Sequence, residues 1–341
     1  MRIYFIIGPY NPGKCGISDY VDLLSKQFEK QGHSIVKHSI EAPNDFVEFS
    51  NNLHDADLYS FQFAPYAFSQ SGLSGNNLFA IAHALQNKKT QVNFHEIWIG
   101  AYPKANLKEK VTGWRQKREI LKFLKIANPT NINSTNSAAL DRLKKEGIDA
   151  KYLYLPGNIP NSAITQTSKK RKNKIAFFGT LYANFPYNLL ADRLMRIAEL
   201  VKLPIELKII GRQRETTGLQ HLESIARNHQ FAIYKTGELT AKEISKELQS
   251  CSIGVSTTPY DVLGKSGSTA AMLEHGLPIF AYDDGDTCKD NLFVFQSFQN
   301  QVFLINDPTI TENVVKLIQR SKKPFFDGVA HTAYKMLEMV N

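Results

Sequence analysis

The stretch IYFIIGPYNPGKCGISDY, from Ile3 to Tyr20, joins a short apolar run to a loop rich in glycine and proline. An apolar run bounded by such a loop predicts a buried strand, Ile3–Ile7. Apolar residues at helical spacing predict a helix over Asp19–Gln31, and the next apolar run predicts a strand over Ser34–His38. This strand–helix–strand order is typical of a parallel sheet covered by helices.

The same alternation continues through the first half of the chain, which we interpret as one doubly wound sheet. Further strands are expected at Leu58–Phe63, Gln91–Phe94 and Tyr152–Leu155, and further helices at Leu78–Leu85, Trp114–Leu124 and Ser137–Glu146.

A change in composition then marks a boundary. The run Pro156–Pro160 and the basic stretch Lys169–Lys172 suit a hinge better than a core. A second series follows, with strands at Ile175–Phe178, Ile205–Ile210, Ala232–Tyr234, Ile253–Ser256 and Ile279–Ala281, and helices at Leu189–Leu200, Leu219–Asn228, Ala241–Gln249 and Thr269–His275. We therefore predict two Rossmann-like α/β domains facing a cleft, residues 1–157 and 158–328, with a C-terminal helix at about 329–341 that packs back onto the first.

Composition narrows the classes of partner. The net charge of +9 and a pI near 9.2 fit nucleic acid, an anionic membrane or phosphorylated ligands. No nucleic-acid-binding module is recognisable, so we expect no nucleic-acid partner. Cys15, Cys251 and Cys288 lack CxxC spacing, which predicts neither disulfides nor a metal site. The apolar run at Ile3–Ile7 is too short for a signal peptide or a membrane span, so a cytoplasmic protein is expected.

The first candidate site is the loop Gly8–Tyr20, whose backbone N–H groups precede a helix and are able to meet an anion or a sugar hydroxyl. Gly16 is its candidate donor-binding residue. The loop almost matches the P-loop pattern, but Cys15 replaces the hydroxyl that binds Mg²⁺, and Pro9 and Pro12 remove two N–H donors. A P-loop and a tight turn without a ligand remain the alternatives.

The second candidate site is His95, which follows a predicted strand and would project into the cleft. A purely structural histidine is the alternative. Glu96 is expected to fix its tautomer or to contact an acceptor, and Trp98 is a second candidate acceptor contact.

The third candidate site is the run GKSGSTAA, Gly264–Ala271, which opens a predicted helix. Small residues let a diphosphate approach the backbone, and the helix N-terminus supplies N–H groups and positive potential. Its candidate residues are Lys265, Ser266, Gly267, Ser268 and Thr269. The alternative is an ordinary Ser/Thr cap, which would explain the hydroxyls but neither the lysine nor the small residues.

Glycines also follow three predicted strands. They are Gly179, Gly211 and Gly237, and the further candidate donor contacts at these turns are Gly179, Thr180, Arg212, Gly237 and Leu239. Such glycines are either simple turns or the floor of a ligand site.

The segment Lys104–Lys125 carries eight basic and two acidic residues together with Trp114 and several aliphatic side chains. A membrane-surface helix and an ordinary solvated helix face are both compatible with this pattern.

At these residues the chain resembles glycosyltransferase family four and its GT-B relatives over nearly its full length. Cys15–Tyr20 with the later Gly32-His33 resembles the opening of that family, His95 its cleft histidine, and Leu155–Pro160 its interdomain junction. Gly276-Leu277-Pro278 resembles the GxP that closes the donor helix. The E-x7-E glutamate pair is absent, because Leu263 and Ala271 stand at its positions, so the donor motif is atypical.

The resemblance implies a glycosyltransferase that moves a hexose from a nucleotide sugar, such as UDP-glucose, to a saccharide or lipid-linked acceptor. It places the acceptor on residues 1–157 and the donor on residues 158–328, implies retention of configuration, and fits polysaccharide biosynthesis. His95 and Lys265 are the expected catalytic residues, and Lys265 with the helix start, helped by Arg212 or Arg214, would stabilise the leaving diphosphate without metal or cofactor. A nucleotide-sugar epimerase and a non-catalytic nucleotide-sugar-binding subunit are the alternatives, and peripheral contact with the inner membrane face is compatible with each.

Overall fold

The computed structural model describes residues 1–41, 45–46, 48–49, 53–101, 105–161, 173–213, 216–283, 298, 300–319 and 326–340. The chain forms two compact units. Unit 1 comprises Met1–Tyr154 and Val329–Asn341, and unit 2 comprises Leu155–Gly328. The basic stretch Lys169–Lys172 and Cys288 lie outside the described residues.

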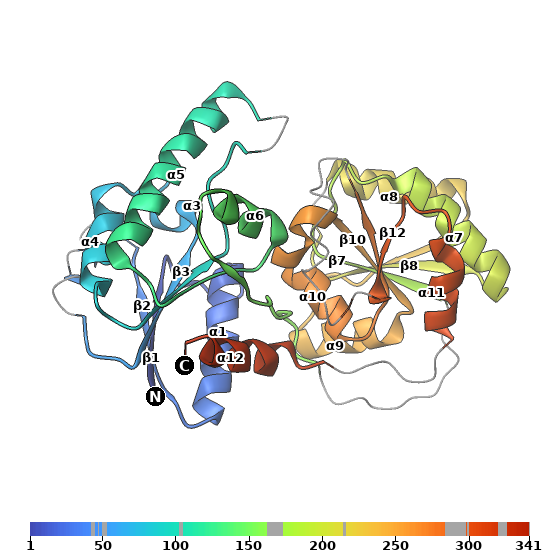
Figure 1. Ribbon diagram of the computed structural model, residues 1–341. Helices are drawn as coiled ribbons and strands as arrows, with labels where there is room; N and C mark the ends of the chain where they lie inside the picture. The colour runs from blue at the N-terminus through green and yellow to red at the C-terminus, as the bar shows by residue number, and fades with distance from the viewer. Residues whose placement is uncertain are drawn as a thin grey trace. The chain divides into compact units, whose positions relative to one another are not determined.

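Unit 1 is a parallel sheet with the strand order β2-β1-β3-β4-β5-β6 (Figure 1). Its strands are β1 (Arg2–Ile7), β2 (Ser34–Ser39), β3 (Leu58–Phe63), β4 (Thr90–Phe94), β5 (Asn131–Ser134) and β6 (Lys151–Tyr152). Its helices include α1 (Gly16–Lys30), α3 (Pro65–Phe68), α4 (Asn76–Leu85), α5 (Leu107–Ala127), α6 (Ser137–Lys145) and α12 (Gly328–Glu338). Apolar residues on one sheet face, such as Phe61 and Val92, pack with α4 and α5.

The opposite face of the sheet in unit 1 is polar along β3, β4 and β5. Side chains alternate between faces along a strand, so the neighbours of Phe61 and Val92 point the other way. These residues are Ser60, Gln62, Gln91 and Asn93, and none of their surface is exposed. The register places Gln62 beside Asn93, and Asn93 beside Asn133 of β5. A buried layer of hydroxyl and amide groups therefore crosses the middle of the sheet.

Unit 2 is a second parallel sheet, with the order β12-β11-β10-β7-β8-β9. Its strands are β7 (Asn173–Phe178), β8 (Ile205–Ile210), β9 (Ala232–Lys235), β10 (Ile253–Pro259), β11 (Ile279–Tyr282) and β12 (Val302–Leu304). Its helices include α7 (Tyr187–Val201), α8 (Thr217–Asn228), α9 (Ala241–Ser250), the 3₁₀ turn η1 (Tyr260–Lys265), α10 (Gly267–Glu274) and α11 (Ile310–Ile318). One apolar core joins the sheet to α7, α8 and α11.

The α/β fold class with two Rossmann-like sheets is confirmed. Helix α5 begins earlier than the predicted Trp114 because Asn106 caps it. The Asn106 side chain accepts a hydrogen bond from the Glu109 N–H, and the Glu109 carboxylate accepts one from the Asn106 N–H. Strand β6 ends earlier than predicted, at Tyr152, and strands β5 and β12 and helices α3 and α11 were missed.

The boundary between the units follows Tyr154 rather than the predicted Gly157. The backbone N–H of Gly157 donates to the carboxylate of Glu274 on α10, over 2.8 Å. This contact ties Gly157 to unit 2. Where the chain returns from unit 2 to unit 1, Thr332 of α12 donates its hydroxyl to the carbonyl of Tyr154, which also belongs to unit 1.

Gly157→Ala is expected to destabilise unit 2. A Cβ at this position would lie 2.6 Å from both the N and the Cα of Ala271, and the backbone of α10 has no room to retreat because its neighbours are buried. We expect a loss of about 1–3 kcal/mol in the free energy of unfolding, measured by urea denaturation. The matched control is Gly16→Ala, because no described atom lies within 4 Å of that Cβ position. Equal stability of the two variants would contradict the assigned contact.

Candidate functional site

The strand order of unit 2 reverses between β7 and β10, which are neighbours in the sheet. Open α/β sheets bind ligands at the carboxyl ends of the strands at such a switch point. Thr257 of β10 donates its hydroxyl to the carbonyl of Thr180 over 2.6 Å and accepts from the N–H of Tyr182 over 3.1 Å. The loop after β7 is thereby fixed to the end of β10.

The N-terminal end of α10 lies at the same place. Gly179 has a φ of +105°, and a Cβ there would lie 2.4 Å from the Oγ of Ser268. Glycine is thus required at this position both for its backbone conformation and for its closeness to α10. Gly179, Thr180 and Ser268, three residues predicted to bind the donor, come together at the switch point.

The first turn of α10 combines a cap with open N–H groups. Ser266 accepts a hydrogen bond from the N–H of Thr269, and the Thr269 hydroxyl donates to Ser266 over 2.8 Å. Thr269 also shares a hydrogen bond with Ser256 and is fully buried. The capping alternative therefore explains both hydroxyls, and the prediction that Thr269 contacts a donor is wrong, because its side chain faces the core.

Two backbone donors remain at the start of α10. The N–H groups of Gly267 and Ser268 precede the first intrahelical bond and have no acceptor among the described residues. The atom nearest to the Cβ position of Gly267 is 3.9 Å away, on Asn158, so the backbone is approachable. Lys265 is exposed beside them. Two N–H groups, the Ser268 hydroxyl and a cation are a set that suits a phosphate group.

The three strand-end glycines are brought to one edge of the sheet, because β7, β8 and β9 are neighbours. Gly211 and Gly237 have φ values of +83° and +72°, so the turn alternative accounts for glycine at both positions. They also form a bridge with one another. Gln213, which the sequence did not suggest, donates its side-chain N–H to the carbonyl of Gly179 over 3.2 Å.

The remaining predicted donor contacts of this edge differ in exposure. Arg212 and Gly237 are exposed, and Leu239 is half-buried. Arg214 lies outside the described residues.

The positions of the absent glutamate pair are apolar and closed. Leu263 is 1% exposed and Ala271 is completely buried, with Gly157 against its backbone. The nearby carboxylate of Glu274, which is also buried, accepts the Gly157 N–H. Glu274 therefore holds the junction in place at the far end of α10.

In unit 1, backbone N–H groups of the loop after β1 donate hydrogen bonds to acceptors within the same segment, Gly8–Tyr20. Asn11 N–H donates to the Ser18 hydroxyl over 2.9 Å, and Gly13 N–H donates to the Asp19 carboxylate over 2.6 Å. The N–H groups of Lys14 and Cys15 donate to the Asn11 carbonyl. Four donors are consumed within the loop, so the P-loop alternative is wrong. Gly16 begins α1 and is exposed.

His95 follows β4 at the edge of the buried polar layer and is 8% exposed. Its Nε2 lies 2.8 Å from the Oε1 of Gln62, an atom that accepts hydrogen bonds only. The Gln62 amide nitrogen donates to Ser60, and Asn93 donates to the same Gln62 oxygen over 3.1 Å, which fixes the orientation of the Gln62 amide. The Asn93 amide nitrogen also lies 3.3 Å from Nε2, but the shorter contact, to the Gln62 oxygen, favours a proton on Nε2 and leaves Nδ1 as an acceptor.

Burial lowers the pKa of His95 from 6.5 to about 4, so its ring is neutral near pH 7. The edge of Tyr20 packs against it, with ring centroids 5.1 Å apart. The prediction that Glu96 fixes the tautomer is wrong, because Gln62 does so and Glu96 is exposed. Gln62 and Asn93 were missed, although polar residues at alternate positions of a predicted strand are a signal for a polar face.

The prediction for Trp98 is also wrong. This residue was expected to contact an acceptor, but it is 6% exposed and belongs to the apolar core of unit 1. Because Ile97 is buried in the same core, the chain turns inward directly after Glu96.

The described residues contain no group of His, Cys, Asp and Glu side chains arranged for a metal ion. None of their helices is both long and apolar enough to cross a bilayer.

We expect nitrogen NMR of the His95 ring to show one tautomer, protonated at Nε2. Gln62→Leu removes the only described acceptor at 2.8 Å and should give a mixture of tautomers. Gln91→Leu is the control, because the Gln91 amide lies in the same polar layer without a described partner. A single Nδ1-protonated tautomer in the unmodified protein would contradict the assignment.

His95 should also make stability depend on pH. Its pKa in the folded state lies below its unfolded value, so its contribution is fully present above pH 6.5 and is lost as the pH falls through about 4. Between pH 7.5 and 4.5 the loss should be about 2–3 kcal/mol larger in the unmodified protein than in His95→Gln, by urea denaturation. Parallel profiles of stability against pH in the two proteins would contradict the lowered pKa of His95.

No family model matches, and no curated protein matches. Among solved structures, Anabaena Alr3699/HepE in complex with UDP and glucose is similar, with a TM-score of 0.53 and 13% identity, over 100% of this chain and 99% of that one. AviGT4, a glycosyltransferase involved in avilamycin A biosynthesis, has a TM-score of 0.52 and 13% identity, over 100% and 97%. An alpha-glucosyltransferase in complex with UDP has a TM-score of 0.56 and 11% sequence identity, over 100% of this chain and 95% of that one. The chain therefore has the GT-B fold.

Proposed function

We propose that this protein is a glycosyltransferase that moves a hexose from a nucleotide sugar, UDP-glucose or a close relative, to a saccharide or lipid-linked acceptor. The observation that supports this proposal most is the start of α10. Because Gly179 has no side chain, Ser268 is able to lie at the switch point of unit 2. The similar structures include complexes with UDP and with UDP-glucose. In this proposal unit 2 binds the donor and unit 1 the acceptor.

The donor diphosphate would bind at the N–H groups of Gly267 and Ser268, with the Ser268 hydroxyl and Lys265 beside it. Negative charge grows on the diphosphate as the bond to the sugar breaks, and preorganised donors stabilise that charge more in the transition state than in the ground state. The protein itself supplies positive potential there, so we propose transfer without metal or cofactor. Retention of configuration is part of the proposal.

His95 would contribute a neutral ring rather than a cation. With Nε2 donating to Gln62, the ring offers Nδ1 as an acceptor for a sugar hydroxyl. Its low pKa keeps this acceptor available at every pH at which the protein is expected to work. Glu96, exposed next to it, remains the proposed acceptor contact. The free thiol of Cys15 fits the proposed cytoplasmic setting.

One observation favours a second candidate, a non-catalytic nucleotide-sugar-binding subunit. Leu263 and Ala271 fill the positions of the missing glutamates and are buried, so this chain lacks the carboxylates that would hold the sugar and ribose there. The epimerase alternative has less support, because it needs free carboxylates in the site and Glu274 is bound to Gly157.

Lys265→Ala is expected to weaken binding of UDP-glucose by about 1.5–3 kcal/mol, since it removes a charge-assisted contact with the diphosphate. Isothermal calorimetry measures the change. Lys242→Ala on the exposed side of α9 is the matched control and should bind as the unmodified protein does. Unchanged affinity in Lys265→Ala would reject the assigned diphosphate site.

Turnover separates the candidate functions. The protein should release UDP from UDP-glucose, with the glucose on water or on an added saccharide, at equal rates with and without EDTA. Abolition by EDTA would reject the metal-independent mechanism. An epimerised nucleotide sugar from the donor alone would identify an epimerase, and tight binding without any turnover would identify the binding subunit.

A further inference from the structure

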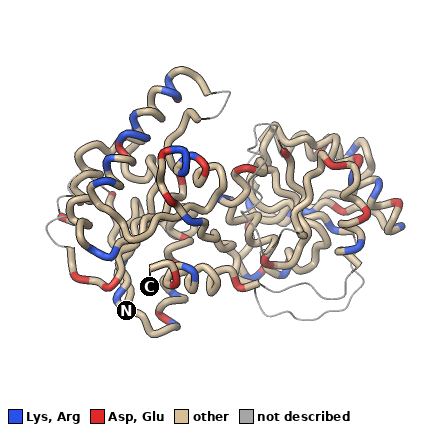
Figure 2. The backbone as a smooth tube through the Cα atoms, viewed as in Figure 1, with Lys and Arg blue, Asp and Glu red and all other residues tan. Residues whose placement is uncertain are grey.

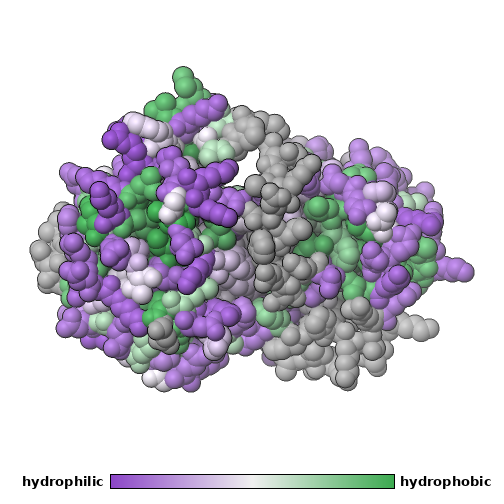
Figure 3. All heavy atoms as spheres, viewed as in Figure 1, coloured by the Kyte–Doolittle hydropathy of each residue, from purple (hydrophilic) through white to green (hydrophobic). Residues whose placement is uncertain are grey.

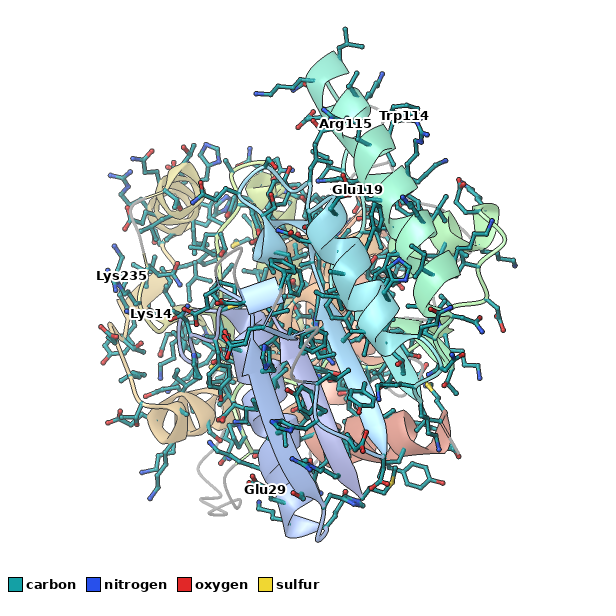
Figure 4. The ribbon with its side chains drawn as sticks, turned by 90° about the vertical axis from the view of Figure 1, so that its left-hand side faces the viewer. Lys14, Glu29, Trp114, Arg115, Glu119 and Lys235 are labelled. Carbon is teal, nitrogen blue, oxygen red and sulfur yellow. The ribbon has the colours of Figure 1, made fainter. Side chains whose placement is uncertain are left out.

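Helix α5 extends beyond the rest of unit 1 at its N-terminal end (Figures 1 and 4). Three large apolar side chains on this part are exposed: Leu107 by 77%, Val111 by 51% and Trp114 by 55%. Their spacing of four and then three residues places them on one face of the helix. Figure 3 shows apolar and hydrophilic surface side by side at this end. An exposed apolar stripe of this kind calls for a partner.

The flanks of the stripe are cationic, and several Lys and Arg residues lie along α5 in Figure 2. The helix contains seven Lys and Arg residues and two Glu residues. Both glutamates are occupied by backbone groups: Glu109 completes the cap, and Glu119 accepts the N–H groups of Ser74 and Gly75 over 3.0 and 3.1 Å. Both glutamates are half-buried, and Lys117 pairs with Glu146, whereas the other six cations of α5 are exposed. The exposed charge of α5 is therefore mainly positive.

A hollow of about 440 Å³ lies beside the stripe. It is lined by Phe79, Trp114, Arg115, Arg118, Glu119, Leu121 and Lys122. Arg118 lies over the Trp114 ring, 4.8 Å from its centroid, and Lys122 lies over the Phe79 ring at 4.0 Å. Each cation is held against an aromatic ring at the surface. An anionic group in this hollow would meet cations, and its apolar tail would meet Trp114.

We propose that α5 docks unit 1 onto a membrane surface that contains anionic phospholipids. The apolar stripe of Leu107, Val111 and Trp114 enters the interface, and the cations on both flanks contact lipid phosphates. Nucleic acid would satisfy the cations but has no apolar phase for the three exposed side chains. A second copy of this chain would bring another positive α5, which repels the first. A charged bilayer satisfies both features at once.

Membrane docking is independent of sugar transfer, so it is measured without nucleotide or acceptor. The full chain is sedimented with vesicles of phosphatidylcholine alone and with vesicles that also contain phosphatidylglycerol. We expect binding to the anionic vesicles, a loss on the order of tenfold or more in Trp114→Ala, and a similar loss in the double variant Lys110→Gln and Lys122→Gln.

Matched controls carry the same changes elsewhere. Tyr334→Ala removes an aromatic side chain that is 60% exposed on α12, and Lys242→Gln with Lys246→Gln removes two exposed charges from α9. Both controls should bind vesicles as the unmodified protein does. Equal losses in the controls and the α5 variants, or no binding to anionic vesicles, would overturn the proposal.

Two further outcomes would also overturn it. The first is binding of duplex DNA, by fluorescence anisotropy, that the Lys110/Lys122 variant loses while Trp114→Ala retains it, together with no vesicle binding. That result would assign the surface to nucleic acid. The second is a dimer in sedimentation velocity that Trp114→Ala dissociates, which would assign the stripe to a second copy.

Discussion

The close approach of backbone to helix α10 is the constraint on which unit 2 depends. Gly179 lies against Ser268 at the start of the helix, and Gly157 lies against Ala271 in its middle. Neither position has room for a side chain, so two distant segments are pinned to the same short helix. The hydrogen bond from Gly157 to Glu274 fixes the other end. An eight-residue helix is too short to be stable alone, and these contacts set where its N–H groups point.

The buried polar layer fixes the arrangement of side chains in unit 1, as the close packing on α10 fixes that helix in unit 2. Amide and hydroxyl groups inside a sheet are costly unless they are paired, so a paired network specifies one arrangement strongly. Ser60, Gln62 and Asn93 form such a chain, and it ends at His95. The orientation of one ring at the sheet edge is thus decided by residues that never reach the surface. The network is incomplete at three places among the described residues, because the Gln91 amide, Asn93 Oδ1 and Asn133 Nδ2 are buried without a hydrogen-bond partner.

Sequence reasoning reached the fold because apolar runs and helical spacing are local signals. The strands Leu58–Phe63 and Ile205–Ile210 have the predicted bounds. Strand β5 was missed because three of its four residues, Asn131, Asn133 and Ser134, are polar. Asn131 and Asn133 are nevertheless buried, on the polar face beside Gln91 and Asn93. Trp98 was misassigned because an aromatic residue after a strand looks the same in sequence whether it faces solvent or core. The contact of Gly179 with Ser268 joins residues far apart in the chain, and no spacing rule reports it.

The discontinuity of unit 1 has a consequence for biosynthesis. Val329–Asn341 belongs to unit 1, where Ala333 and Met336 are fully buried, while the continuous segment Leu155–Gly328 makes up unit 2. During translation, the unit that begins second is therefore the first whose segments have all been synthesised. The unit that emerges first has to wait, with an uncovered apolar patch, until α12 has been synthesised. Chaperone demand during synthesis should therefore concentrate on the part of the protein that is made earliest.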